Sequence, residues 1–452
     1  MKFYNNITEL FGNTPLVKLN KLTTGIKATV LAKLESFNPG GSVKDRIGYS
    51  MIKAAEEDGT LKPGGTIVES TSGNTGIGLA LAASQKGYKC IFVMTEKVSN
   101  EKRNLLKALG ADIVIQPMTA KYGDPEHYVI KAIDIASKTP NAIYINQYGN
   151  PSNPKMHYDT TGPEIWRDTD GKVTHFVAGI GTGGTISGTG RFLKDQNPNI
   201  KVIGADPLGS IFKTLKDSGV TPEPIPYLIE GIGQDILPDN VDFSVIDEII
   251  NVPDDVSVSY TRLLTREEGI FCGGSTGTIV YTALQVAKKL SENDVVVFIV
   301  CDTGERYLSK YHSEKWLREK RLLKTSQIDI NTIITTKHSA NLPPVISVAS
   351  GDPVYLALEK IDANNISTIP VIDDGVCTGS VRESDIIKKI MDDRTIADKP
   401  VSSFMSDSLP AVDKHCGLSE ALNLLKSDNA ILVTEFGKVI GIVTRYDVLD
   451  FV

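Results

Sequence analysis

One lysine of this chain stands where a reactive amine would be useful. Lys44 follows the turn segment NPGGS (38–42) and opens a stretch that we expect to be an amphipathic helix. A lysine in the first turn of a helix faces the positive end of the helix dipole, which lowers the pKa of its amine. The neutral amine can form a Schiff base with a carbonyl compound. Taken alone, the motif favours the plainer interpretation of a solvated lysine after a turn.

Polar groups gather in the segment STSGNTG (70–76), directly after a short apolar run. Its hydroxyls, its amide and the N–H groups of an expected helix N-terminus form a cluster that suits a carboxylate ligand. A single helix cap needs fewer polar side chains than the four present here. We therefore predict a ligand site rather than an elaborate cap.

The segment GIGTGGT (179–185) has the composition of a phosphate-binding loop. Its glycines free backbone N–H groups, and the helix expected after it adds the positive end of its dipole. Gly179, Gly181 and Gly184 also match the pattern GxGxxG, and Asp206 closes the next expected strand. An NAD-dependent hydride-transfer enzyme is therefore an open alternative from this motif.

Two further loops are ambiguous when taken alone. GGSTG (273–277) offers a hydroxyl in a tight turn before an apolar stretch, and EGIGQD (230–235) is a polar loop with no evident structural need. A helix cap and an ordinary loop explain them as well as a ligand site does.

The elements that must position these loops follow from hydrophobic periodicity. Short apolar runs alternate with amphipathic, Ala-rich stretches over residues 28–320, which predicts strand–helix units around parallel sheets. In such sheets ligands bind at the carboxyl ends of the strands, where the glycine loops stand. The expected strands are 28–35, 66–70, 90–95, 112–116, 174–180, 201–206 and 295–301, and the expected helices are 42–59, 74–87 and 100–110.

The C-terminal part contains an internal repeat. Residues 368–390 and 430–452 share an apolar strand, a turn, a second strand with a glycine and a helix start with an aspartate. Gly379 aligns with Gly441, and Asp385 aligns with Asp447. Each copy of about 60 residues is too small to bury a good core alone, so we expect a pair of α/β motifs.

Composition excludes several classes of function. The net charge of -7 disfavours nonspecific nucleic-acid binding, and no apolar run approaches the roughly 20 residues needed to span a membrane. The start of the sequence lacks a secretory h-region. Five scattered cysteines without a CxxC pair indicate reduced thiols and a cytoplasmic protein, and six histidines without an HxxxH pair argue against a bound metal.

Together the motifs resemble the fold-type II (tryptophan-synthase-β-like) pyridoxal-phosphate enzymes, and within them the cystathionine β-synthase and cysteine synthase branch. FGNTPLVKL (11–19) and the four glycine motifs at 38–46, 70–76, 179–185 and 273–277 occur in the family's order. The resemblance covers roughly residues 5–318, and it replaces the NAD interpretation because the family's glycine loop holds a single phosphate. The repeat resembles a tandem pair of CBS domains, the Bateman module. We expect a catalytic domain of two parallel-sheet subdomains (1–318), a linker (319–339) and CBS motifs at 340–394 and 395–452.

The resemblance implies a role for each motif. Lys44 would hold the cofactor and then act as the base on the substrate α-proton. Ser275 would face the pyridine nitrogen, and a neutral hydroxyl there favours β-replacement over transamination. The cofactor would be bound by Lys44, Asn74 (at the ring oxygen), Gly181, Thr182, Gly183, Gly184, Thr185 and Ser275. The substrate would be bound by Thr71, Ser72, Asn74, Thr75, Gln147, Tyr148, Gly231 and Gly233.

The segment EGIGQDILP (230–238) resembles the cystathionine β-synthase form of this loop. It implies condensation of serine or O-acetylserine with homocysteine to cystathionine, the first step of transsulfuration, with hydrogen sulfide release as a side activity. Gln234 stands where many relatives have Tyr, which leaves the preferred donor open. Cysteine synthase is the alternative, and an adenosyl-ligand-binding regulatory protein is an alternative of another class. FGNTPLV begins at Phe11, so we expect no haem-binding N-terminal extension and no haem.

The second CBS motif carries a pattern for adenosyl ligands. GIVTRYD (441–447) resembles the family's Gly-h-h-Thr-x-x-Asp segment (h, hydrophobic), which makes Thr444 and Asp447 candidate contacts for S-adenosylmethionine or an adenine nucleotide. The first motif offers Asp385 but has Arg382 at the Thr position. A purely structural dimerisation module is the alternative. The family also implies a homodimer or a dimer-derived tetramer.

Overall fold

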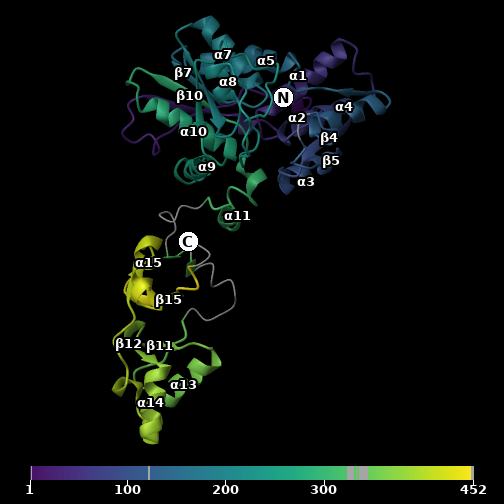
Figure 1. Cartoon of the computed structure of the whole chain (residues 1–452). Coiled ribbons are helices and arrows are strands. Elements are labelled where there is room, and N and C mark those ends of the chain that lie inside the picture. Colours follow the sequence, from purple (N-terminus) through teal and green to yellow (C-terminus); the bar gives the residue numbers. More distant parts are fainter. Residues whose placement is uncertain (2, 121–122, 323–329, 332, 335–344, 449–452) are drawn as a thin grey trace. The chain divides into compact units, whose positions relative to one another are not determined.

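The structure is a computed structural model that describes residues 1, 3–120, 123–322, 330–331, 333–334 and 345–448 (Figure 1). The chain divides into two compact units, Met1–Leu317 and Arg318–Val452. The helices of the first unit are α1 (Lys44–Glu57), α2 (Asn74–Lys86), α3 (Asn100–Ala108), α4 (Tyr128–Lys138), α5 (Ser152–Met156), α6 (Gly162–Asp168), α7 (Gly184–Gln196), α8 (Phe212–Ser218), α9 (Asp254–Glu268), α10 (Gly274–Ala287) and α11 (Glu314–Glu319).

The larger sheet of the first unit has the order β1-β2-β10-β7-β8-β9. Its strands are β1 (Leu16–Lys18), β2 (Thr29–Leu34), β7 (His175–Gly179), β8 (Lys201–Pro207), β9 (Glu248–Val252) and β10 (Val295–Val300). Only the edge pair β1–β2 is antiparallel, and the other pairs are parallel. The chain reaches β10 last and inserts it between β2 and β7, so the segment after β10 meets the segment after β2.

The apolar run of β10 is continuous because helices cover both faces of this sheet. Val296 and Phe298 pack in a core with the apolar side of α10, and Val297 and Ile299 pack on the other face with residues of α7. Figure 1 shows α10 and α7 on either side of β10. The expected strand at 295–301 is therefore confirmed as a buried central strand.

The smaller sheet has the order β5-β4-β3-β6 and is parallel throughout. Its strands are β3 (Thr66–Ser70), β4 (Lys89–Thr95), β5 (Asp112–Gln116) and β6 (Ala142–Tyr144). Helices α1 and α2 pack on each other and share one core with this sheet, while α4 covers the other face. The expected α/β fold with two parallel-sheet subdomains is confirmed, and the expected elements end within a few residues of the observed ones.

The second unit repeats one motif. Strands β11 (Thr368–Asp373) and β12 (Val376–Arg382) form one hairpin with α13 (Val354–Ala363) and α14 (Glu383–Asp392) beside it in the chain. Strands β13 (Ala411–Asp413), β14 (Ala430–Glu435) and β15 (Lys438–Thr444) accompany α15 (Leu418–Ser427). Both hairpins show an irregular register directly after the pairs Val371–Gly379 and Val433–Gly441. The predicted alignment of the two glycines therefore holds in three dimensions.

One part of the predicted linker belongs to a core. Ile330, Ile333 and Ile334 are buried with residues of α15 and β14. Gly441 has no side chain because a Cβ there would come within 2.7 Å of Ile334 Cδ1. These apolar residues therefore pack in the core of the second motif. Apart from Asn331, the other residues of 323–344 lie outside the described part of the chain.

Candidate active site

A cavity of about 570 Å³ lies at the carboxyl ends of the strands of the first unit. Five segments meet there: the lysine loop (38–46), the polar segment (70–76), the glycine loop (179–185), the EGIG loop (230–235) and the start of α10. This agrees with the expectation that ligands of parallel sheets bind at the carboxyl ends of the strands. Fourteen predicted residues line it: Lys44, Thr71, Ser72, Asn74, Thr75, Gln147, Tyr148, Gly181, Thr182, Gly183, Thr185, Gly231, Gly233 and Ser275. Gly184 is the one predicted cofactor or substrate contact that does not line the cavity, and it is the first residue of α7.

Lys44 is the first residue of α1 and projects to the cavity. The backbone N–H of Val43 donates to Cys301 O at 2.9 Å, which ties this helix start to the end of β10. Burial lowers the pKa of Lys44, against the opposing effects of Cys301, Asp302 and Glu35. No described group accepts a hydrogen bond from its side-chain nitrogen. The amine therefore has the properties of a nucleophile, and burial is the main cause rather than the helix dipole.

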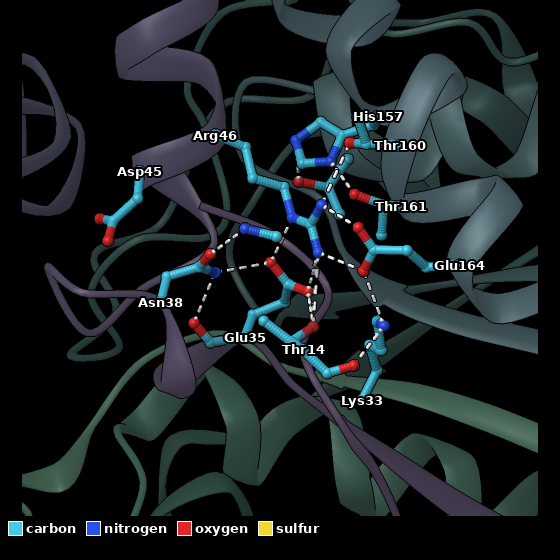
Figure 2. A network of polar contacts seen from close by, with 12 residues as sticks. Thr14, Lys33, Glu35, Asn38, Asp45, Arg46, His157, Thr160, Thr161 and Glu164 are labelled. Atoms are coloured by element: carbon cyan, nitrogen blue, oxygen red, sulfur yellow. Dashed lines mark hydrogen bonds and ion pairs between the residues drawn. The ribbon is translucent and has the colours of Figure 1, made fainter. Parts of the chain in front are cut away.

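A buried network of ion pairs holds the first turns of α1 in place (Figure 2). Arg46 lies between two carboxylates: its Nε is 2.7 Å from Glu35 Oε2, and its Nη1 is 2.7 Å from Glu164 Oε1. Lys33 approaches Glu164 at 2.8 Å. Burial raises the pKa of Glu164, but the hydrogen bonds and charges of Arg46 and Lys33 lower it to about 2. The network fixes the backbone two residues from Lys44.

The polar segment forms a turn suited to an anion at the start of α2. Gly73, with φ of 113°, donates its N–H to Thr71 Oγ1 at 2.9 Å. Thr75 donates to Gln147 Oε1 at 2.6 Å, and Gln147 donates back to Ser70 O at 2.7 Å. The backbone N–H groups of residues 72, 74 and 75 have no acceptor among the described groups. Together they offer several donors to one carboxylate.

The glycine loop has the features of a phosphate cradle. The backbone N–H groups of residues 181–185 have no acceptor in the described structure, and they stand at the N-terminus of α7. A Cβ on Gly181 would meet Gly231 O at 2.8 Å, and a Cβ on Gly184 would meet Asn153 Oδ1 at 1.8 Å. The backbone of Gly231 and the side chain of Asn153 therefore approach the loop too closely for side chains at these two glycines. These residues fit a phosphate group, as a pyridoxal-phosphate site requires.

A neutral histidine, His157, holds the side chain of Thr185 in place. His157 Nε2 is 3.1 Å from Thr185 Oγ1, and its Nδ1 is 2.9 Å from Thr161 Oγ1. Burial, followed by the charges of Arg46 and Lys44, lowers the pKa of His157 to about 3. The imidazole is therefore uncharged at neutral pH and links the buried ion network to the glycine loop.

Ser275 is buried in the first turn of α10, in the wall of the cavity. The thiol of Cys301 lies beside it. Burial raises the pKa of Cys301 to about 12, although Lys44 and a hydrogen bond with Ser275 act in the opposite direction. A neutral thiol and a neutral hydroxyl therefore form this wall. Such a wall suits the unprotonated pyridine nitrogen of pyridoxal phosphate.

The EGIG loop closes another wall of the cavity. Gly233 donates to Ile180 O at 2.7 Å, which ties this loop to the glycine loop. Glu230 is buried and pairs with Lys102 at 3.0 Å and with Lys310. These contacts make the loop a fixed part of the site. Gln234 lines the cavity, and its backbone N–H donates to Ser210 Oγ at 3.1 Å.

Several residues of the site belong to none of the sequence motifs. Lys97 lines the cavity, and burial lowers its pKa to about 8. Its ammonium lies 4.2 Å from the ring centre of Tyr227, a cation–π contact. Asp302 and Arg306 contact Asn74. The sequence did hold one signal for these residues: Lys97 follows β4, and Asp302 and Arg306 follow β10. Both segments begin at the carboxyl end of a parallel strand, where ligands bind.

Asp206 does not take the position that the dinucleotide pattern requires. It is buried outside the cavity lining, and its carboxylate is 3.4 Å from Asn251 Nδ2. Burial raises its pKa to about 7. A buried carboxylate of this kind supports the end of β8 and offers nothing to a ribose.

The adenosyl candidates belong to the second unit. The backbone N–H and the hydroxyl of Thr444 both donate to Asp447 Oδ2 at 2.7 Å, which caps the turn after β15. Asp385 is exposed in the first turn of α14. Thr444 and Asp447 therefore form one polar turn.

Comparison with known proteins agrees with this geometry. Residues 7–302 match the model of the pyridoxal-phosphate-dependent enzymes, and residues 340–392 and 401–452 match the CBS domain. A cystathionine β-synthase from Saccharomyces cerevisiae is 35% identical over 99% of this chain and 97% of its own length. The chain belongs to the cystathionine β-synthase family.

Other members of the cystathionine β-synthase family match a shorter part. The Apis mellifera protein is 49% identical over 71% of this chain, and the match spans 64% of that protein. For the Rattus norvegicus protein the match is 47% identical and spans 58% of its length. A solved structure, an O-acetylserine-dependent cystathionine β-synthase from Helicobacter pylori, is 39% identical with a TM-score of 0.63 and covers 69% of this chain and 99% of its own.

No helix in the described part of the chain is long and apolar enough to cross a membrane. No group of three or more His, Cys, Asp or Glu side chains that could hold a metal ion occurs among the same residues.

Proposed function

We propose that this protein is a cystathionine β-synthase that joins homocysteine to the β-carbon of serine or O-acetylserine. The observation that carries the proposal is the convergence of Lys44, the anion-binding turn at α2 and the phosphate cradle at α7 on one cavity. When bound, pyridoxal phosphate supplies an electron sink for the substrate α-carbon. The residues that would hold it are Lys44, Asn74, Ser275 and the loop 181–185.

The residues of the cavity would orient the substrate, accept its proton and limit the access of water. The anion-binding turn, with Gln147 behind it, would orient the amino-acid carboxylate so that the α-proton faces Lys44. The neutral amine of Lys44, whose pKa is lowered by burial, can accept that proton. The buried Ser275 and the partly buried Cys301 would limit the access of water to the reacting carbon. The EGIG loop would flank the thiol acceptor.

The donor is tested by incubating the protein with homocysteine and either serine or O-acetylserine in separate tubes. Mass spectrometry of the products identifies cystathionine, and we expect it in at least one tube. The Helicobacter pylori relative is described as O-acetylserine-dependent, which makes that tube the informative one. Cysteine formed from O-acetylserine and sulfide, with no cystathionine in either tube, would instead identify a cysteine synthase.

Regulation by an adenosyl ligand is a second part of the proposal. The polar turn of Thr444 and Asp447 would contact the ribose of S-adenosylmethionine or an adenine nucleotide. The whole protein would act in the cytoplasm as a homodimer or a dimer-derived tetramer, without haem. Added S-adenosylmethionine should raise the melting temperature or change the activity of the wild type but not of Asp447→Ala. No change in activity, melting temperature or oligomeric state would remove the sensor.

A further inference from the structure

The amide of Asn74 is held from two sides by charged groups that belong to none of the glycine motifs. Its Nδ2 donates to Asp302 Oδ2 at 2.7 Å, and its Oδ1 accepts from Arg306 Nη1. All three side chains are buried. Both residues follow β10: Asp302 lies between this strand and the 3-10 turn Gly304–Tyr307, and Arg306 lies within that turn. Two charged residues thus converge on one neutral amide.

This arrangement allows one orientation of the Asn74 amide. Rotation by half a turn would place Oδ1 against the Asp302 carboxylate and Nδ2 against the Arg306 guanidinium, and both contacts would be repulsive. In the observed orientation Nδ2 keeps a second N–H. Asn74 also lines the cavity, so that N–H is available to a ligand there.

Asp302 is itself fixed by its surroundings. Tyr307 donates its hydroxyl to the same Oδ2 at 2.6 Å, and residue 302 forms a bridge with Ser42 in the lysine loop. A Cβ on Gly273 would lie 2.4 Å from Asp302 Oδ1, so the aspartate packs directly on the loop before α10. The Asp302 carboxylate therefore fixes the position of the Asn74 side chain relative to the two loops that carry Lys44 and Ser275.

We propose that Asp302 and Arg306 are positioning residues that direct the free Nδ2–H of Asn74 to the ring oxygen of bound pyridoxal phosphate. The inference rests on the proposed function, which assigns Asn74 to that oxygen. Donation to the ring oxygen stabilises its anionic form, and this form gives the bound cofactor its visible absorbance. Neither charged residue touches the cofactor, and both act through Asn74.

The test is the substitution Asp302→Asn, which keeps the size of the side chain. An amide at 302 can turn either its oxygen or its nitrogen to Asn74, so only Arg306 still favours the observed orientation of the Asn74 amide. We expect roughly tenfold weaker binding of pyridoxal phosphate to the apoprotein and a lower ratio of visible to near-ultraviolet absorbance. Glu305→Gln is the matched control, because it makes the same chemical change at an exposed position of the same segment, and it should change neither reading.

A double-substitution cycle separates this role from a general loss of structure. Asn74→Ala should reproduce the absorbance change, and adding Asp302→Asn to it should change the ratio no further. Additive effects, or an unchanged ratio in Asp302→Asn, would overturn the inference. A wild type that shows no visible band on adding pyridoxal phosphate would instead refute the proposed function.

Two further measurements test the inference if the variant Asp302→Asn does not fold. If the melting curve shows that Asp302→Asn does not fold, Arg306→Met should give the same spectral change from the other side of the amide. A crystal structure of the wild-type holoenzyme decides without any variant. Asn74 Nδ2 within hydrogen-bond distance of the ring oxygen supports the inference, and any other contact of that oxygen contradicts it.

Discussion

The guanidinium of Arg46 forms two hydrogen bonds of 2.7 Å with the carboxylate of Glu164, which lies 118 positions further along the chain. Both side chains are buried, and Lys33 approaches the same carboxylate. This pair joins α1, which begins with Lys44, to α6 (Figure 2). The position of the reactive lysine therefore depends on charge pairing in the protein interior.

Removal of one partner should be costly. Glu164→Gln leaves the charges of Arg46 and Lys33 incompletely compensated in a buried site, so we expect the free energy of unfolding to fall by about 3–5 kcal/mol. Denaturant titration of the full chain measures it. Glu57→Gln, in the exposed pair Lys53–Glu57, should stay within about 0.5 kcal/mol. Equal effects of the two substitutions would contradict the assigned role of the network.

The neutral state of His157 predicts a pH dependence of stability. Its pKa is about 3 in the folded protein and about 6.5 in the unfolded chain, so the unfolded chain binds the extra proton between these values. The free energy of unfolding should therefore fall as pH decreases below 6.5, by about 1.2 kcal/mol per unit near pH 5.5 from this residue. His157→Gln should lose that share of the slope. An unchanged slope would show that His157 is charged in the folded state.

Gly184 offers a test of the phosphate cradle. Gly184→Ala would place a Cβ 1.8 Å from Asn153 Oδ1, so the loop must move. We expect at least roughly tenfold weaker binding of pyridoxal phosphate, because the loop's N–H groups lose their common orientation. Gly351→Ala is the control, since nothing lies within 4 Å of its Cβ position. Fluorescence titration of the apoprotein compares the two, and equal affinities would count against the cradle.

Lys44→Ala should separate catalysis from folding. No described group accepts a hydrogen bond from the Lys44 side chain, so its removal breaks no contact that supports α1. We expect cystathionine formation to fall below detection while the melting temperature of the apoprotein stays within a few degrees. Product analysis and thermal denaturation measure the two effects. Retained activity would exclude Lys44 as the base.

Much of this site could be predicted from sequence because its parts are local. The segments at 70–76 and 179–185 each combine a strand end, glycines and a helix start, and the carboxyl-end rule brings such segments together. The lowered pKa of Lys44 was predicted in direction, but burial, which depends on tertiary packing, is its larger cause.

The remaining site residues could not be found locally. Asp302 contacts Asn74 across 228 positions, and that contact exists only because β10 is inserted between β2 and β7. Likewise, Ile330 and Ile334 read as part of a linker, since the core that buries them is built by residues about a hundred positions later. Contacts of this kind depend on topology rather than on periodicity.

The attachment point of the cofactor tests the central claim most directly. Two lysines with lowered pKa line the cavity, Lys44 and Lys97. Borohydride reduction of the protein loaded with pyridoxal phosphate, followed by peptide mapping, locates the lysine that carries the cofactor. We predict the added mass on the peptide that contains Lys44. Its presence on Lys97 instead, or on no lysine, would contradict the site described here.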